Sequence, residues 1–134
     1  MTKVIVFGTF DILHPGHLDF FKQAKKFAQK LIVVVARDVN VKKIKHKKPL
    51  NNEKDRLKLV SELNVVDNSV LGNLNNPYKI IQKVKPDVIC LGYDQKIFTD
   101  NLSNNFPKIK IVRLKAYKRN INKSSKFKNL ICWI

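Results

Sequence analysis

The chain has 134 residues, of which 44% are hydrophobic and 28% charged, and this balance predicts one globular domain over residues 1–134. Its longest apolar run, 31–36, is far shorter than the roughly 20 residues of a membrane-spanning helix, so we expect a cytoplasmic protein with no membrane partner. Its 27 basic and 10 acidic side chains give a net charge of +17, which favours anionic partners. Because only four of the basic residues are Arg and aromatic residues do not alternate with the lysines, we expect no specific nucleic-acid partner.

Strand patterns and helix patterns alternate along the chain. Apolar runs predict strands at 3–8, 31–36, 68–72, 88–91 and 109–114. Helical spacing and capping residues predict one helix that opens at 14–17. They predict further helices over 52–63, 77–84 and 124–131. Residues 39–49 are predicted as a lysine-rich loop, and no element is predicted between Gly92 and Pro107. Cys90 lies within a strand pattern and is expected in the core.

This alternation predicts an α/β fold with a doubly wound, five-stranded parallel sheet in the order 3-2-1-4-5. Ligands of such sheets bind beyond the carboxyl ends of the strands, where the winding direction reverses. For this strand order the crevice lies between the first and fourth strands. We therefore expect the loops that follow Phe7 and Leu91 to face each other.

The turn between the first strand and the first helix has the composition of a phosphate site. Gly8 permits a close approach of the backbone, Pro15 suits the first helical position, and Gly16 places no side chain in the path of a phosphate. A helix N-terminus attracts anions, and His14 and His17, three residues apart, would reach the same anion. Two other interpretations stay open: a helix cap with a surface histidine, or a metal pair completed by Asp11.

The segment GTFDILHPGH at residues 8–17 resembles the signature of the cytidylyltransferase-like nucleotidyltransferases. The resemblance implies a Rossmann-like fold, in-line attack of an acceptor phosphate on the α-phosphate of ATP or CTP, and a Mg²⁺ ion held mainly by the nucleotide with no metal ligand from the protein. It also suggests a homodimer. Through the motif, it assigns nucleotide contacts to Gly8, Thr9, Phe10, Asp11, His14, Pro15, Gly16 and His17.

Further positions resemble the archaeal FAD synthase branch of this family, in which the AMP moiety of ATP is transferred to FMN, giving FAD and pyrophosphate. They are Ala36-Arg37-Asp38, the lysines 42, 43 and 45, Glu53 with Arg56, residues 91–95, Arg113 with the Lys-Ala-Tyr-Lys that follows Leu114, and Ser124-Ser125. We predict that Lys43 and Lys45 act with His14 and His17 in catalysis. The predicted acceptor-binding residues are Asp38 and Arg56, and the further nucleotide-binding residues are Gly92, Asp94, Arg113, Tyr117, Ser124 and Ser125.

Two alternative functions follow from the same sequence. Within the family, the chain could resemble glycerol-3-phosphate cytidylyltransferase and use CTP with a small phosphorylated alcohol. From another class, the net charge of +17 allows a nucleic-acid-binding domain that has the fold without the chemistry. Such a domain would bind DNA or RNA with a steep dependence on salt, and this binding would survive replacement of both histidines.

Overall fold

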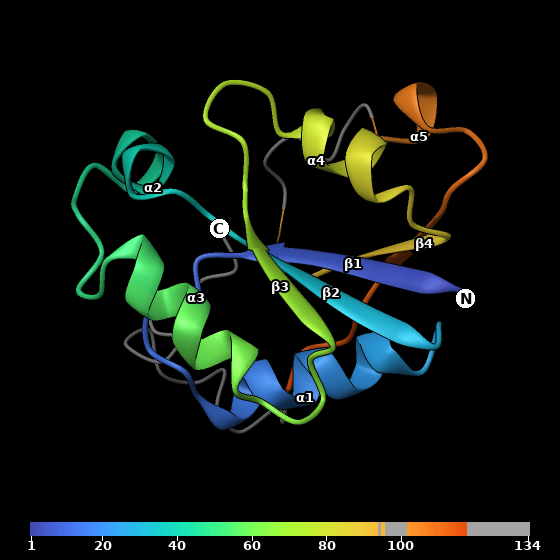
Figure 1. Ribbon diagram of the computed structural model, residues 1–134, viewed down its shortest axis with the longest axis horizontal. Helices are drawn as coiled ribbons and strands as arrows, with labels where there is room; N and C mark the ends of the chain where they lie inside the picture. The colour runs from blue at the N-terminus through green and yellow to red at the C-terminus, as the bar shows by residue number, and fades with distance from the viewer. Residues whose placement is uncertain (94, 96–101, 118–134) are drawn as a thin grey trace.

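Five short segments form one parallel sheet in the computed structural model, which describes residues 1–93, 95 and 102–117. The strands are β1 (Lys3–Gly8), β2 (Lys30–Val35), β3 (Asn68–Leu71), β4 (Val88–Leu91) and β5 (Lys110–Arg113). They lie in the order β3-β2-β1-β4-β5, and every neighbouring pair is parallel (Figure 1). The predicted doubly wound α/β fold and its strand order are therefore confirmed.

The sheet is covered on both faces because successive strand residues point in opposite directions. On one face, Val4, Val6, Val33 and Cys90 pack with α1 (Pro15–Lys25) and α3 (Glu53–Ser61). On the other face, Ile5, Phe7, Val34 and Ile89 pack with α4 (Tyr78–Val84) and α5 (Leu102–Asn105). Figure 1 shows the two helical layers, with α1 and α3 on one side of the sheet and α4 and α5 on the other.

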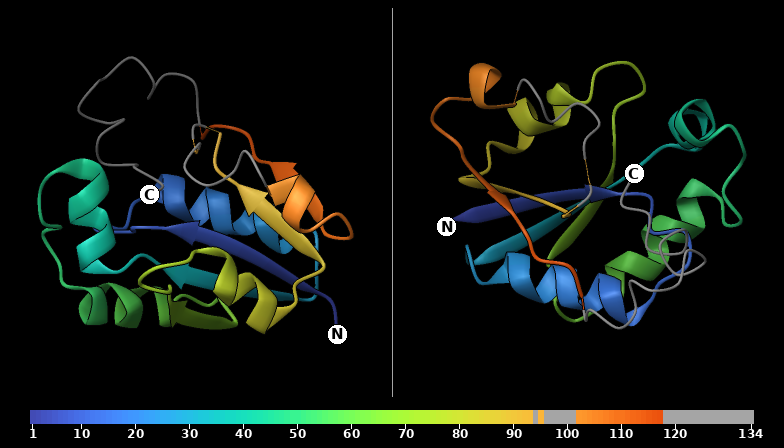
Figure 2. Two further views of the ribbon diagram at one scale, coloured as in Figure 1. Left: turned by 90° about the horizontal axis from the view of Figure 1, so that it is seen from above. Right: turned by 180° about the vertical axis from the view of Figure 1, so that it is seen from behind.

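Residues 38–45, which were predicted to lie in a loop, form the helix α2 (Asp38–Lys45), so that part of the prediction is wrong. The helix begins with Asp38 in its first turn and ends with lysines in its last turn, and both charges complement the helix dipole. Val41 is the only buried residue of this helix, and its lysines and Asn40 favoured the prediction of a loop. In Figure 2, α2 lies beyond the carboxyl ends of the strands.

The other boundaries of helices and strands agree with those predicted from the sequence to within a few residues. Asn52 caps α3, since its Oδ1 accepts a hydrogen bond of 2.8 Å from the backbone N–H of Asp55. The helix α1 ends at Lys25, so Phe27 lies beyond it and is 38% exposed. The helix α5 occupies part of the region in which no element was predicted, and the predicted helix at 124–131 lies outside the described residues.

Two further findings concern the core and the membrane. Cys90 is fully buried, as expected, and burial raises the pKa of its thiol to about 12. In the part of the chain that the structure describes, no helix has the length and apolarity needed to cross a membrane.

The ends of β1 and β4 meet at the point where the winding direction of the sheet reverses. Gln95, which follows β4, is buried, and its Nε2 donates a hydrogen bond of 3.3 Å to the carbonyl oxygen of Phe7 in β1. This contact confirms that the loops after Phe7 and Leu91 face each other.

Candidate active site

The turn after β1 ends in the first turn of α1, where backbone N–H groups lack partners within the helix. His14 is the N-cap, with Pro15 next to it at the helix start, and its Nδ1 accepts a hydrogen bond of 2.9 Å from the N–H of Gly16. This bond assigns the proton of a neutral His14 ring to Nε2. The capping interpretation of His14 is thus correct, and in its neutral ring Nε2 is the nitrogen that carries the proton.

His17 lies one turn further along α1 and is almost completely buried, with 1% of its surface exposed. Its ring centroid lies 6.3 Å from that of His14, and the two rings are perpendicular. Burial, followed by the positive charges of His14 and Lys45, lowers the pKa of His17 to about 4, and burial also lowers the pKa of His14. Near pH 7, His17 is therefore neutral and can donate an N–H without carrying a full charge.

Gly8 is required by the close approach of a ring. A Cβ atom added at Gly8 would lie 2.4 Å from Cζ of Phe10, which is far inside van der Waals contact. Phe10 itself has a φ of 52°, is 1% exposed, and packs against Phe21 and His17 at centroid distances of 5.1 and 5.4 Å. The buried Phe10 ring therefore supports the turn from the side of the core. The backbone of Phe10, and not its side chain, is placed to contact a nucleotide.

The turn is fixed in place by Arg56, a fully buried residue of α3. Its guanidinium donates to the carbonyl oxygens of Thr9 (2.8 Å) and Asn51 (3.0 Å), and it forms an ion pair of 2.6 Å with Asp38. Arg56 and Thr9 are buried, at 0% and 1% exposed, whereas the Asp38 side chain is 36% exposed. Arg56 and Asp38, whose binding of the acceptor stays a prediction, are placed to hold the turn after β1.

Asp11 has a similar structural role. Its two carboxylate oxygens accept hydrogen bonds from the backbone N–H groups of Leu50 (2.7 Å) and Asn51 (2.8 Å). The predicted contact of Asp11 with a nucleotide, and its alternative as a metal ligand, both compete with these bonds. Asp11 therefore ties the turn after β1 to the segment between α2 and α3.

The opposite wall of the crevice is formed by residues that follow β4 and β5. Nη1 of Arg113 donates to the carbonyl oxygens of Gly92 (2.8 Å) and Gln95 (2.6 Å), so Arg113 braces the loop after β4. Gln95 lies within the predicted loop after Leu91, but the sequence analysis assigned it no role. Tyr117 is half-buried. Asp94, Ser124 and Ser125, which were predicted to bind the nucleotide, lie outside the described residues.

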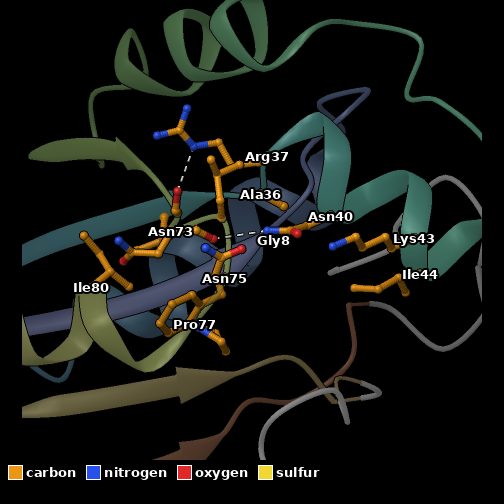
Figure 3. Close-up of a pocket in the computed structure, with 14 residues that line it drawn as sticks. Gly8, Ala36, Arg37, Asn40, Lys43, Ile44, Asn73, Asn75, Pro77 and Ile80 are labelled. Carbon is orange, nitrogen blue, oxygen red and sulfur yellow. Dashed lines mark hydrogen bonds between the residues drawn. The ribbon is translucent and has the colours of Figure 1, made fainter.

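A cavity of about 360 Å³ lies on the other side of Gly8, at the carboxyl ends of β1, β2 and β3. Figure 3 shows residues from these strand ends and from α2 around it. Its apolar lining includes Phe7, Val34, Ile44 and Ile80, and its polar lining is Arg37, Asn40, Lys43, Asn73 and Asn75. The sequence analysis did not predict this cavity. The turn residues Asn73 to Pro77, which follow the third strand, were the available signal.

The two lysines that were predicted to be catalytic lie in different surroundings. Lys43 lines the cavity, whereas the charge of Lys45 acts on His17. Among the described residues, no group of three or more His, Cys, Asp and Glu side chains is arranged to hold a metal ion.

The chain is similar to several known proteins. Residues 5–129 match the family described as Cytidylyltransferase-like. An FAD synthase of Aciduliprofundum boonei is 46% identical over 121 residues, which cover 87% of this chain and 80% of the relative. An FAD synthase of Thermoplasma volcanium is 42% identical over 135 residues, which cover 98% and 94%. A crystal structure described as the lipopolysaccharide core biosynthesis protein from Thermoplasma volcanium GSS1 superposes with a TM-score of 0.82 at 43% identity, over 88% of this chain and 99% of that one.

Proposed function

The chain belongs to the cytidylyltransferase-like family, and we propose that it transfers the adenylyl group of ATP to FMN, which gives FAD and pyrophosphate. An oxygen of the FMN phosphate attacks the α-phosphorus of ATP. A new P–O–P linkage forms while the bond to the β-phosphate breaks, and pyrophosphate leaves with the electron pair. The observation that carries this proposal is the similarity to two archaeal proteins named FAD synthase over most of each chain.

The turn after β1 is the proposed site of the triphosphate. Phosphoryl-type transfers depend on positioning and on donors directed at the phosphate oxygens on which charge develops. The first amides of α1 and the N–H of the neutral His14 and His17 rings would supply such donors. The support for this placement is geometric: both histidines come from the first turn of one helix, and the turn is held from below by Arg56.

The cavity beside Gly8 is the proposed site of the flavin ring. Its volume of about 360 Å³ lies within the range of sites for small organic molecules, and apolar side chains with a few amides suit a flat aromatic ring that carries polar edges. Because Gly8 lines both this cavity and the turn, a flavin bound there would have its phosphate near the triphosphate.

The proposal includes a divalent metal, Mg²⁺. The described residues contain no cluster of metal ligands, and Asp11 is engaged with backbone N–H groups, so the phosphate oxygens of ATP would hold the ion. When bound, Mg²⁺ neutralises negative charge on the phosphates. We further propose that residues 1–134 form one nucleotidyltransferase domain, in support of which the family match covers 5–129, and that the protein is a cytoplasmic homodimer.

A panel of substrates tests this function. Purified protein with MgATP and FMN is expected to produce FAD, measured by liquid chromatography, together with an equal amount of pyrophosphate. Matched reactions contain CTP with FMN, ATP with glycerol 3-phosphate, and CTP with glycerol 3-phosphate. Pyrophosphate release only in the last of these would show that the FMN assignment is wrong and that the cytidylyltransferase alternative is right.

A binding measurement separates the proposed enzyme from a nucleic-acid-binding domain. Titration with generic RNA and DNA at several salt concentrations would reveal tight, steeply salt-dependent binding if the second class applied. If that binding survived replacement of His14 and His17 while no substrate pair released pyrophosphate, the protein would not be an enzyme of this family's type.

A further inference from the structure

The sheet opens between β1 and β4 at the end where the substrates are proposed to bind. The strand β1 stays paired with β2 as far as Gly8, and β4 stays paired with β5 as far as Leu91. Among the described residues, the pairing of β1 with β4 ends earlier, at Ile5 and its partner Ile89. Each of these two central strands is therefore held by its outer neighbour up to its carboxyl end. The two separate from each other where the winding direction reverses.

The side chain of Gln95 bridges this opening. Its Oε1 accepts a hydrogen bond of 3.1 Å from the N–H of Gly92, which follows β4, and its Nε2 donates one of 3.3 Å to the carbonyl oxygen of Phe7 in β1. An amide side chain offers the same kind of donor and acceptor as a peptide group. Gln95 thus connects the two strands in the way that a further step of strand pairing would.

Gln95 is itself held in place by the loop after β4 and by β5. Its backbone N–H donates a hydrogen bond of 3.1 Å to the carbonyl oxygen of Gly92. Nη1 of Arg113, at the end of β5, donates to the carbonyl oxygens of Gln95 (2.6 Å) and Gly92 (2.8 Å). Because Gln95 is only 1% exposed, its amide is out of reach of a substrate. Its effect on a substrate has to pass through the strands that it joins.

We propose that Gln95 is a positioning residue, which fixes the spacing between the loop after β4 and the end of β1 and so aligns the nucleotide with the acceptor phosphate. The assignment rests on the proposed function, in which the nucleotide lies in this crevice and the acceptor in the cavity beside it. Phe7, whose carbonyl oxygen accepts from Gln95, lines that cavity and directly precedes Gly8, which lines both the cavity and the turn. The bridge therefore connects the nucleotide crevice to the acceptor cavity.

The transfer reaction is sensitive to this spacing. An in-line attack requires the acceptor oxygen and the α-phosphorus within about 3–3.5 Å of each other, and a displacement of about 1 Å can lower the rate roughly a hundredfold. Without the amide, the ends of β1 and β4 would lose a connection beyond the point where their pairing ends. We therefore expect loss of the bridge to lower kcat more than it weakens the binding of either substrate.

The first substitution removes both hydrogen bonds of the amide. Gln95→Met introduces an apolar side chain of similar length, and its activity is measured as pyrophosphate release from MgATP and FMN. We expect kcat to fall about tenfold or more, because the reacting atoms are no longer aligned. The KM values for ATP and for FMN should each change less than about threefold, because Gln95 contacts neither substrate.

Gln95→Glu separates the two hydrogen bonds of the amide. At about pH 9 a carboxyl group is ionised, so it can still accept from the N–H of Gly92 but has no proton to donate to the carbonyl oxygen of Phe7. We expect kcat, relative to the wild type at the same pH, to fall as far as in Gln95→Met. Wild-type kcat in Gln95→Glu would overturn the proposal, because the bridge to β1 would then be unnecessary.

The matched controls are Gln82→Met and Gln82→Glu, which make the same changes at an exposed position of α4. Neither is expected to alter kcat or KM. The unfolding midpoint of each variant shows whether it is folded during the assay. If Gln95→Met is unfolded at the assay temperature, Gln95→Glu, which keeps the shape of the native side chain, decides the question.

The possible outcomes distinguish this role from the function on which it rests. A KM that rises as much as kcat falls would make Gln95 a determinant of binding, and lower stability with an unchanged kcat would make it a structural residue. Either result would overturn the proposal. If the wild type released pyrophosphate with another pair of substrates and not with ATP and FMN, the proposed function would be wrong, and the same variants measured with that pair would decide the role of Gln95. If no pair reacted, both proposals would be wrong.

Discussion

The turn after β1 and the cavity beside it differ in how their residues are distributed and how firmly they are held. The turn is one continuous segment, 8–17, and its supports are buried: Phe10, His17 and Arg56 are each 1% exposed or less. The cavity is assembled from the ends of three strands, from α2 and from the segment before α4, and several of its polar residues are exposed. The proposed nucleotide site is therefore supported by the core, whereas the proposed flavin site is lined in part by exposed residues.

The largest effect is expected at the support of the turn. Replacing Arg56 by Met should lower the free energy of unfolding by about 3–5 kcal/mol, because it removes the buried guanidinium and leaves the carbonyl oxygens of Thr9 and Asn51 without their donor. Denaturant unfolding measures this change. The replacement Lys54→Met, at an exposed position of the same helix, is the matched control and should change little. Equal stability of the two variants would refute the claim that the turn is held by the core.

The second prediction concerns pH. Burial and nearby positive charges lower the pKa of His17 to about 4, whereas in the unfolded chain it has its ordinary value of 6.5. Below pH 6.5 the unfolded chain therefore takes up a proton that the folded protein does not. Stability should be constant with respect to this group above pH 6.5 and should fall as the pH is lowered to about 4. The expected total is on the order of 3 kcal/mol.

The His17→Asn variant isolates this contribution. We expect the difference in unfolding free energy between wild type and variant to depend on pH between about 4 and 6.5 and to be constant above that range. Carboxylates that titrate in the same range cancel in the difference. A difference that does not vary with pH would mean that His17 is not buried in its neutral form.

The contrast between the two regions also explains what could be predicted from the sequence. The positions of the strands followed from alternating patterns, and the turn followed from adjacent residues, because both depend on local spacing, whereas the strand order followed from the doubly wound fold class. The roles of Asp11, Asp38 and Arg56 could not be predicted, since each is defined by a partner 15 or more residues away. The cavity was missed for the same reason. The helix α2 was missed because its lysines and Asn40 favour a loop and Val41 is its only buried residue.

The third prediction separates two roles of His14. As N-cap, its Nδ1 accepts from Gly16, and its other nitrogen is proposed to contact a phosphate. Asn at this position can keep the cap, so His14→Asn should retain the stability of the wild type to within about 0.5 kcal/mol, while His14→Ala loses about 1 kcal/mol. Both variants should lose roughly a hundredfold in kcat/KM for ATP, because each removes the phosphate donor. Steady-state kinetics and denaturant unfolding measure the two roles, and full activity of His14→Asn would limit this residue to capping.

The fourth prediction tests the packing between Gly8 and Phe10. A Cβ at Gly8 would lie 2.4 Å from Cζ of the Phe10 ring, which is confined by Phe21 and His17. Gly8→Ala should therefore lower the free energy of unfolding by about 1–3 kcal/mol through overpacking. In a Phe10→Leu background, Gly8→Ala should lower the free energy of unfolding by less than it does in the wild type. If the methyl group cost the same in both backgrounds, the ring would not be the reason for glycine here.

The smallest effect is expected on the acceptor side. Asn75 lines the cavity, is exposed, and follows β3 in the turn before α4. Its replacement by Ala should leave the free energy of unfolding within about 0.5 kcal/mol of wild type, because it supports no buried group. Loss of one neutral hydrogen bond of about 1 kcal/mol to the flavin should raise the KM for FMN about fivefold. The KM for ATP, measured in the same assays, is the internal control, since the nucleotide is proposed to occupy the turn. An equal rise in both constants would mean that the two regions do not bind their substrates independently, and an unchanged KM for FMN would place the flavin ring away from Asn75.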